Sequence, residues 1–183
     1  MGKVYQAIDE RLREFILAQP VFFVATAPSG DSGHVNVSPK GLRGSLAVLS
    51  PLRVAYLDYG GSGAETVAHL RDNGRITVMF CAFDGPPKVL RLHGRGRAVY
   101  RTDPECASLL AHFDDPAPGL RAVVDVEVTR VSDSCGFGVP LMSYAGDRDL
   151  LPRYWERRTD DEILAYHAQR NASSVDGLPV WDG

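Results

Sequence analysis

The sequence predicts a mainly β fold, an antiparallel barrel with helices packed outside it. Six or seven β-rich runs follow one another with links of hairpin length. Only two helical segments interrupt these runs, so the chain lacks the alternation that is typical of β-α-β units. With 183 residues, of which 44% are hydrophobic and 23% charged, the chain is expected to form a single domain over 1–183.

The chain is expected to open with a helix and a hairpin. Over 4–18, apolar side chains recur with the helical period until Gln19-Pro20 ends the pattern. Two β-rich runs follow, at 21–27 and 34–38, and a cluster of turn-forming residues separates them. These two runs predict a β-hairpin.

The central stretch is predicted to hold two short strands, a glycine-rich turn and a helix. The strands are expected at 46–49 and 54–58. The second of them runs into Gly60-Gly-Ser-Gly63 and then into a helix of about 63–72, which Asn73-Gly74 ends. The rest of the chain is organised around this turn.

Two interpretations of the turn are open from the residues alone. Glycines allow a positive φ and a close backbone approach, and the free N–H groups at a helix start favour a phosphate. Ser62 followed three residues later by Glu65 also fits a capping box. The first interpretation predicts an anion site, and the second predicts a well-capped turn.

The second half of the chain is predicted to add the longest strands. They are expected at 75–83, 88–100 and 120–131, with strong β character in the last because of its valines. Gly94 and Gly96 interrupt the middle strand. A glycine inside a strand indicates a β-bulge or a close backbone approach.

Three further helices are expected outside the sheet. They are placed at about 104–112, 147–157 and 159–169, and a proline suits the first helical position of the earliest one. Thr159 followed by Glu162 predicts a capping box at the start of the last helix. An irregular tail follows.

Composition narrows the classes of function. The formal net charge of −3, without any basic run, argues against nucleic-acid binding. The sequence shows no signal peptide and no run of membrane-spanning length, so a cytoplasmic protein is expected. The three cysteines form neither a disulfide framework nor a metal pattern, and no metal is expected. Cys81 is expected to be buried, whereas Cys135 lies in a loop-like setting where a reactive thiol is conceivable.

Several short motifs follow one another along the chain: Phe23-Val-Ala-Thr26, His34-Val-Asn-Val-Ser-Pro-Lys-Gly41, Tyr56-Leu-Asp58, Gly61-Ser-Gly63, Glu65-Thr66, Asn73-Gly-Arg-Ile-Thr-Val-Met-Phe80 and Leu90-Arg-Leu-His-Gly94. Their order and spacing resemble the pyridoxamine 5′-phosphate oxidase-like family of flavin-binding split barrels. The resemblance covers about 5–135 as the barrel, and it leaves about 136–183 as a helical and irregular C-terminal extension.

The resemblance implies a six-stranded antiparallel split barrel and a homodimer that binds FMN in the grooves between its subunits. It therefore implies an FMN-dependent oxidoreductase acting on a small-molecule substrate, and FMN-facing segments at 34–40 and 58–66. The expected cofactor-binding residues are Asn36, Val37, Ser38, Pro39, Lys40, Asp58, Gly61, Ser62, Gly63 and Thr66.

The chemistry of these residues suits a phosphate and a flavin ring. Lys40 supplies a cation, and the hydroxyls of Ser38, Ser62 and Thr66 supply hydrogen-bond donors. The backbone of the glycine turn supplies N–H groups. The Asn36 amide could meet the isoalloxazine edge, where carbonyls and an N–H alternate.

The chain departs from this family in two places. Gly63-Ala-Glu65 stands where true pyridoxamine phosphate oxidases carry an arginine and a lysine for the FMN phosphate. Their arginine and histidine set for the substrate phosphate near the C-terminus also has no visible counterpart here. These two departures argue against oxidation of vitamin B6 more strongly than against binding of a flavin.

Other interpretations stay open. The same fold could hold the deazaflavin F420 or haem, or it could be a non-catalytic flavin-binding module. No catalytic acid or base stands out, because a flavin itself carries the electrons. His93 is kept as a conceivable haem ligand or proton donor. A basic helical patch is predicted to form a salt-linked surface, and its residues are Arg148, Arg153, Arg157 and Arg158.

Overall fold

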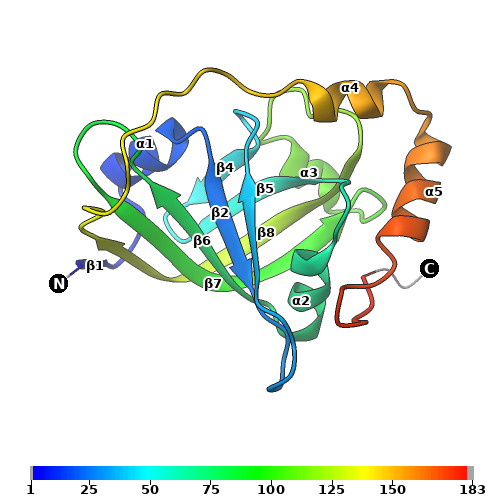
Figure 1. The fold of residues 1–183 in the computed structure, drawn as a ribbon, viewed down its shortest axis with the longest axis horizontal. Helices are drawn as coiled ribbons and strands as arrows, with labels where there is room; N and C mark the ends of the chain where they lie inside the picture. The colour runs from blue at the N-terminus through cyan, green and yellow to red at the C-terminus, as the bar shows by residue number, and fades with distance from the viewer. Residues whose placement is uncertain (1, 181–183) are drawn as a thin grey trace.

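The computed structural model describes residues 2–180, and an open antiparallel sheet dominates it (Figure 1). The strands are β1 Val4–Tyr5, β2 Phe22–Thr26, β3 Asn36–Lys40, β4 Leu46–Ser50, β5 Arg53–Tyr59, β6 Arg75–Cys81, β7 Val89–Tyr100 and β8 Leu120–Ser134. The helices are α1 Glu10–Ala18, α2 Glu65–Asn73, α3 Cys106–Leu110, α4 Leu150–Glu156 and α5 Asp160–Arg170. The prediction of a mainly β fold with flanking helices is confirmed.

The strand order is β3-β2-β6-β7-β8-β5-β4, and β1 pairs with β8 beside this path. The sheet has eight strands and does not close, so the expected number of six is wrong. The long β8 explains part of the difference, because its 15 residues pair with β7, β5 and β1. The two-residue β1 is too short for a sequence period to reveal.

The main hydrophobic core lies inside the curve of the sheet. Leu12 and Ile16 of α1 pack there against buried strand residues such as Phe22, Val78 and Phe80. The spacing of four between Leu12 and Ile16 puts both on one face of the helix. Figure 1 shows α1 at one end of the sheet and α4 and α5 at the other.

The first helix begins later than the sequence pattern predicts. Asp9 is its N-cap, and the Asp9 carboxylate accepts a hydrogen bond from the Leu12 N–H at 2.8 Å. Val4 and Tyr5 instead pair with Ser132 and Val131 of β8. Strand pairing therefore overrides a helical period that included residues 4 and 5.

The predicted hairpin is present, but its second strand is shifted. β2 and β3 pair from Phe22↔Lys40 to Thr26↔Asn36, so β3 covers 36–40 rather than 34–38. The backbone N–H and the ring of His34 both bond to Asp176. This contact with the C-terminal tail takes His34 out of the strand.

The second half of the chain follows the expected order with shorter helices. A register shift between His93 and Gly94 confirms the predicted bulge, and Gly74 ends α2 with φ of 71°. Both sides of the Thr159 capping box are formed. The helices α3 and α4 are shorter than the predicted 104–112 and 147–157, because residues 101–105 and 147–149 form turns, bends or irregular chain.

Candidate functional site

The edge strand β3 presents two different faces. Asn36, Ser38 and Lys40 are half-buried and alternate with exposed residues, as the period of two requires. Val37 and Pro39 lie on the opposite, exposed face, where Val37 is 61% exposed. Among the predicted site residues on this strand, the structure thus brings three side chains to the interior side and leaves two outside.

Asn36 joins β3 to the start of α2. The Asn36 amide donates to Thr66 Oγ1 at 3.1 Å and to Thr26 Oγ1 at 3.4 Å. Thr26 Oγ1 also lies 3.0 Å from Nδ1 of the buried His69. The amide nitrogen is therefore engaged within the protein, while Ser38 Oγ, which is buried, has no hydrogen-bond partner in the described residues.

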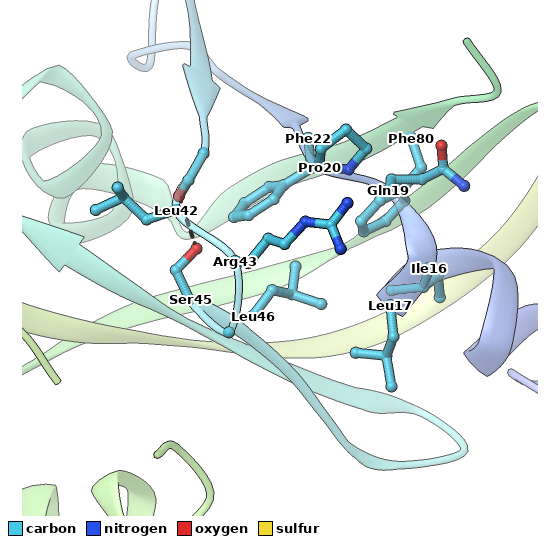
Figure 2. A pocket seen from close by; sticks show the side chains of 12 residues that line it. Ile16, Leu17, Gln19, Pro20, Phe22, Leu42, Arg43, Ser45, Leu46 and Phe80 are labelled. Atoms are coloured by element: carbon cyan, nitrogen blue, oxygen red, sulfur yellow. Dashed lines mark hydrogen bonds between the residues drawn. The ribbon is translucent and has the colours of Figure 1, made fainter. Parts of the chain in front are cut away.

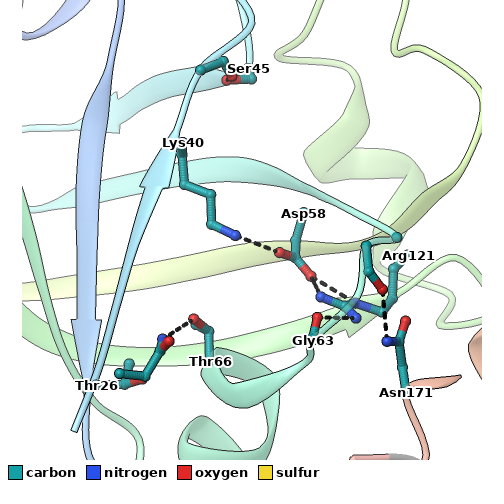
Figure 3. A network of polar contacts seen from close by, with 12 residues as sticks. Thr26, Lys40, Ser45, Asp58, Gly63, Thr66, Arg121 and Asn171 are labelled. Atoms are coloured by element: carbon teal, nitrogen blue, oxygen red, sulfur yellow. Dashed lines mark hydrogen bonds and ion pairs between the residues drawn. The ribbon is translucent and has the colours of Figure 1, made fainter. Parts of the chain in front are cut away.

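Lys40 belongs to a cluster of three charged side chains, whose other members are Asp58 and Arg121 (Figure 3). Asp58 is the last residue but one of β5 and is fully buried. Its carboxylate accepts hydrogen bonds from Arg121 Nε at 2.8 Å and from Arg121 Nη2 at 2.7 Å, and Lys40 Nζ lies 3.4 Å away. One carboxylate thus faces two cations, which leaves the cluster with a surplus of one positive charge.

Two opposing effects act on the pKa of Asp58. Burial by itself raises the pKa of a carboxyl, because it disfavours the charged form. The charges and hydrogen bonds of Arg121 and Lys40 outweigh burial and hold the pKa of Asp58 below its ordinary value. Asp58 is therefore an anion whose role is to hold the two cations in place.

The glycine turn between β5 and α2 is fixed through its carbonyl groups. Trp155 Nε1 donates to the Gly60 carbonyl at 3.2 Å, and Asn171 Nδ2 donates to the Gly61 carbonyl at 3.0 Å. Arg121 Nη1 donates to the Gly63 carbonyl at 3.2 Å. Two of these three donors come from the C-terminal extension, so the extension shapes the turn.

The opposite side of the turn is open. No atom lies within 4 Å of a Cβ placed on Gly61 or Gly63. The N–H groups of residues 61, 62 and 63 have no hydrogen-bond acceptor within residues 2–180. Carbonyls held on one side and free N–H groups make this turn suited to an anion.

The capping interpretation of the turn is wrong. Ala64 is the N-cap of α2, and no side chain caps it. The exposed Ser62 makes no capping bond, and the Glu65 carboxylate accepts the Val175 N–H at 3.0 Å instead. A backbone N–H of the tail therefore binds the Glu65 carboxylate, the acid that the sequence places at the start of the helix.

A cavity of about 460 Å³ adjoins the charge cluster and the turn. Lys40, Gly60 and Gly61 line it from the sheet domain, and Asp147 and Arg148 line it from the C-terminal extension. Leu57, Leu150 and Leu151 add apolar wall. This is the size and mixture of surfaces that small-molecule sites show.

A second cavity of about 220 Å³ shares Gly41 and Leu42 with the first (Figure 2). Its walls are mostly apolar and include Phe22, Leu46 and Phe80. Arg43 is the charged residue among those that line it. The loop that follows Lys40 thus separates two hollows of different character.

Three residues of the site were not predicted from the sequence. Arg121 stands alone as a charge among the apolar residues at the start of β8, and this contrast was a usable signal. Trp155 and Asn171 gave no comparable signal, because their partners are backbone carbonyls more than 90 residues away in the sequence. Such contacts exist only in the folded chain.

The other candidate residues lie apart from this site. His93 lines a different cavity with Thr77 and Thr129, and its Nδ1 lies 3.1 Å from Thr77 Oγ1. Burial, then Arg130 and Arg91, lower its pKa. Cys81 is buried as expected, and Cys135 is exposed.

Within residues 2–180, no group of three or more His, Cys, Asp or Glu side chains could hold a metal ion. None of the helices in that range combines the length and the apolar character needed to cross a bilayer.

The fold and the site together are those of an antiparallel β-sheet domain. It has a cavity beside a glycine turn, and the free N–H groups of this turn suit an anion. A family model described as pyridoxamine 5′-phosphate oxidase matches residues 8–135. The pyridoxamine 5′-phosphate oxidase family protein ustO of Aspergillus flavus is 42% identical over 190 residues, which cover 96% of this chain and 76% of the relative. This chain belongs to the pyridoxamine 5′-phosphate oxidase family.

Solved structures of low sequence identity share the fold. HupZ of Group A Streptococcus is 18% identical, with a TM-score of 0.53 over 74% of this chain and 99% of its own. An FMN-binding protein of Syntrophomonas wolfei is 15% identical, with a TM-score of 0.50 over 66% of this chain and 82% of its own. These likenesses confirm the predicted type of fold.

Proposed function

We propose that this chain binds FMN at the Lys40 end of β3 and acts as an FMN-dependent oxidoreductase on a small molecule. The observation that carries the proposal is the surplus positive charge of Lys40, Asp58 and Arg121 beside a glycine turn whose N–H groups at 61–63 have no acceptor within residues 2–180. The negative charge of a phosphate would be attracted by that surplus, and the phosphate oxygens would accept hydrogen bonds from the free N–H groups. Membership of the family supports the proposal, as does the fold shared with an FMN-binding protein.

The residues present fit a phosphorylated flavin. Ser38 Oγ is a buried hydroxyl without a partner in the described chain, and a buried polar atom of this kind calls for a ligand atom. Lys40, Ser62 and Thr66 would hold the phosphate region, and the strand of Asn36 would face the ring. FMN itself supplies hydride or electron transfer, while the chain binds it, orients it and limits access of water.

The proposal includes a homodimer with the cofactor groove between its subunits. β3 pairs with β2 on one side only, and Val35 and Val37 on this edge are 71% and 61% exposed. An exposed apolar edge of this kind is typical of a surface that another chain covers. We expect a dimer at micromolar concentration without cofactor, and a monomeric sedimentation profile with bound FMN would contradict the groove.

The visible spectrum of the freshly purified protein, with identification of any released chromophore by mass, tests the cofactor. Release of FMN from a yellow protein supports the proposal, and turnover with reduced nicotinamide would then separate an oxidoreductase from a non-catalytic flavin-binding module. Release of F420 or haem would replace FMN by one of the two alternatives. A colourless protein that takes up no added FMN would refute the proposal.

A further inference from the structure

The C-terminal extension supplies a positive charge to the cavity beside the glycine turn. Lys40 of the sheet domain lines this cavity, but the start of the helix, Gly63-Ala-Glu65, carries no cation. Arg148 lines the same cavity from the stretch that leads to α4. A charge missing from the turn thus has a counterpart about 85 residues later in the chain.

The neighbours of Arg148 leave its charge available. Asp147 also lines the cavity, and its carboxylate accepts the Arg43 N–H at 3.0 Å. Asp149 pairs with Arg153 at 2.7 Å. Arg148 forms no ion pair within residues 2–180, although the sequence pattern predicted a salt-linked surface for it.

The charges around the cavity add up to a cationic site. Among the residues that line it, the cations are Lys40 and Arg148 and the carboxylate is Asp147, so one positive charge remains. Lys40 belongs to the sheet domain, where Asp58 holds it. Arg148 is the cation of this set that no carboxylate holds, and a guanidinium suits the geometry of a phosphate.

We propose that Arg148 binds the phosphate of the ligand, so that the C-terminal extension adds to the anion site of the sheet domain a guanidinium that no carboxylate holds within residues 2–180. This inference rests on the proposed function. In this proposal, Arg148 makes the protein bind a phosphorylated ligand more tightly than the same ligand without its phosphate. The hydrogen bonds of Trp155 and Asn171 to the Gly60 and Gly61 carbonyls also tie the extension to the turn.

The test compares the affinities for FMN and for riboflavin, which lacks the phosphate. We expect Arg148→Ala to weaken FMN binding about 10- to 100-fold, the loss of one charge-assisted hydrogen bond, and to leave riboflavin binding unchanged. Arg148→Lys should recover part of the loss because it keeps the charge. Arg153→Ala is the matched control, since Arg153 is an exposed arginine of α4 already paired with Asp149, and both affinities should stay unchanged.

The outcomes separate this inference from the proposed function. An Arg148→Ala protein that binds FMN as tightly as the wild type, or that loses FMN and riboflavin equally, would overturn the role of Arg148 and leave flavin binding standing. A wild-type protein that binds neither flavin would overturn the proposed function and the inference together. Melting temperatures of all variants identify any loss that comes from unfolding.

Discussion

Two aspartates in neighbouring strands hold two cations each, yet their surroundings differ. Asp58 of β5 binds Arg121 and Lys40, whose side chains are 3% and 24% exposed. Asp125 of β8 binds Arg53 and Arg97, whose side chains are 46% and 49% exposed. The cations of Asp58 are thus largely shielded from water, and those of Asp125 are not.

The balance of charge differs as well. Arg97 also pairs with Glu105, so two acids match two cations around Asp125. Around Asp58 one acid faces two cations next to a glycine turn with free N–H groups. The buried and unbalanced Asp58 cluster is therefore the one at which we propose a ligand, whereas the balanced Asp125 cluster, whose two arginines reach water, is expected to serve the fold.

The largest expected effect is on stability. Asp58→Asn should lower the free energy of unfolding by about 3–5 kcal/mol, because it leaves Arg121 buried without a counterion. Asp125→Asn should cost only about 1 kcal/mol, since both of its arginines reach water. Urea titrations of both variants measure the difference. Equal losses would show that burial does not distinguish the two clusters.

The next effect is a dependence of stability on pH through His167, which packs beside the Asp58 cluster. Burial, and then the charge of Arg121, lower the pKa of His167 from 6.5 to about 4, while Asp58 opposes them. Between pH 6.5 and about 4, His167 therefore binds a proton in the unfolded chain but not in the folded chain. The free energy of unfolding should decline as pH falls from 6.5 towards 4, by roughly 3 kcal/mol in all.

His167→Gln isolates this contribution because glutamine does not titrate. The difference in unfolding free energy between the wild type and this variant should shift in favour of the variant as pH falls through that window. Urea titrations at several pH values measure it. A difference that stays constant from pH 7 to about 4 would mean that His167 is freely protonated in the folded protein.

A smaller effect concerns ligand binding. Lys40→Ala should weaken FMN binding by about 1.5–3 kcal/mol, the contribution of a hydrogen bond to a charged group. Arg53→Ala removes the corresponding cation from the Asp125 cluster and should leave FMN affinity unchanged. Fluorescence titration of FMN measures both. If the dissociation constant for Lys40→Ala equals that of the wild type, Lys40 lies outside the site.

The strands were predictable because their signals are local. The β-rich runs of β2, β6 and β8 and the glycine bulge at Gly94 follow from residues next to one another. The alternation of β3 also reveals that Asn36, Ser38 and Lys40 share a face, although the strand begins two residues later than predicted. A contact with Asp176 decides that shift, and no local pattern contains it.

The sequence by itself determined the fold class, the family resemblance and the glycine turn between a strand and a helix. The tertiary structure alone decided what surrounds that turn. Arg121, Trp155 and Asn171 contact it from distant parts of the chain, and Arg148 lines the cavity beside it. Backbone propensity and hydrophobic period act over a few residues, whereas an ion cluster and a cavity depend on which distant segments the fold brings together.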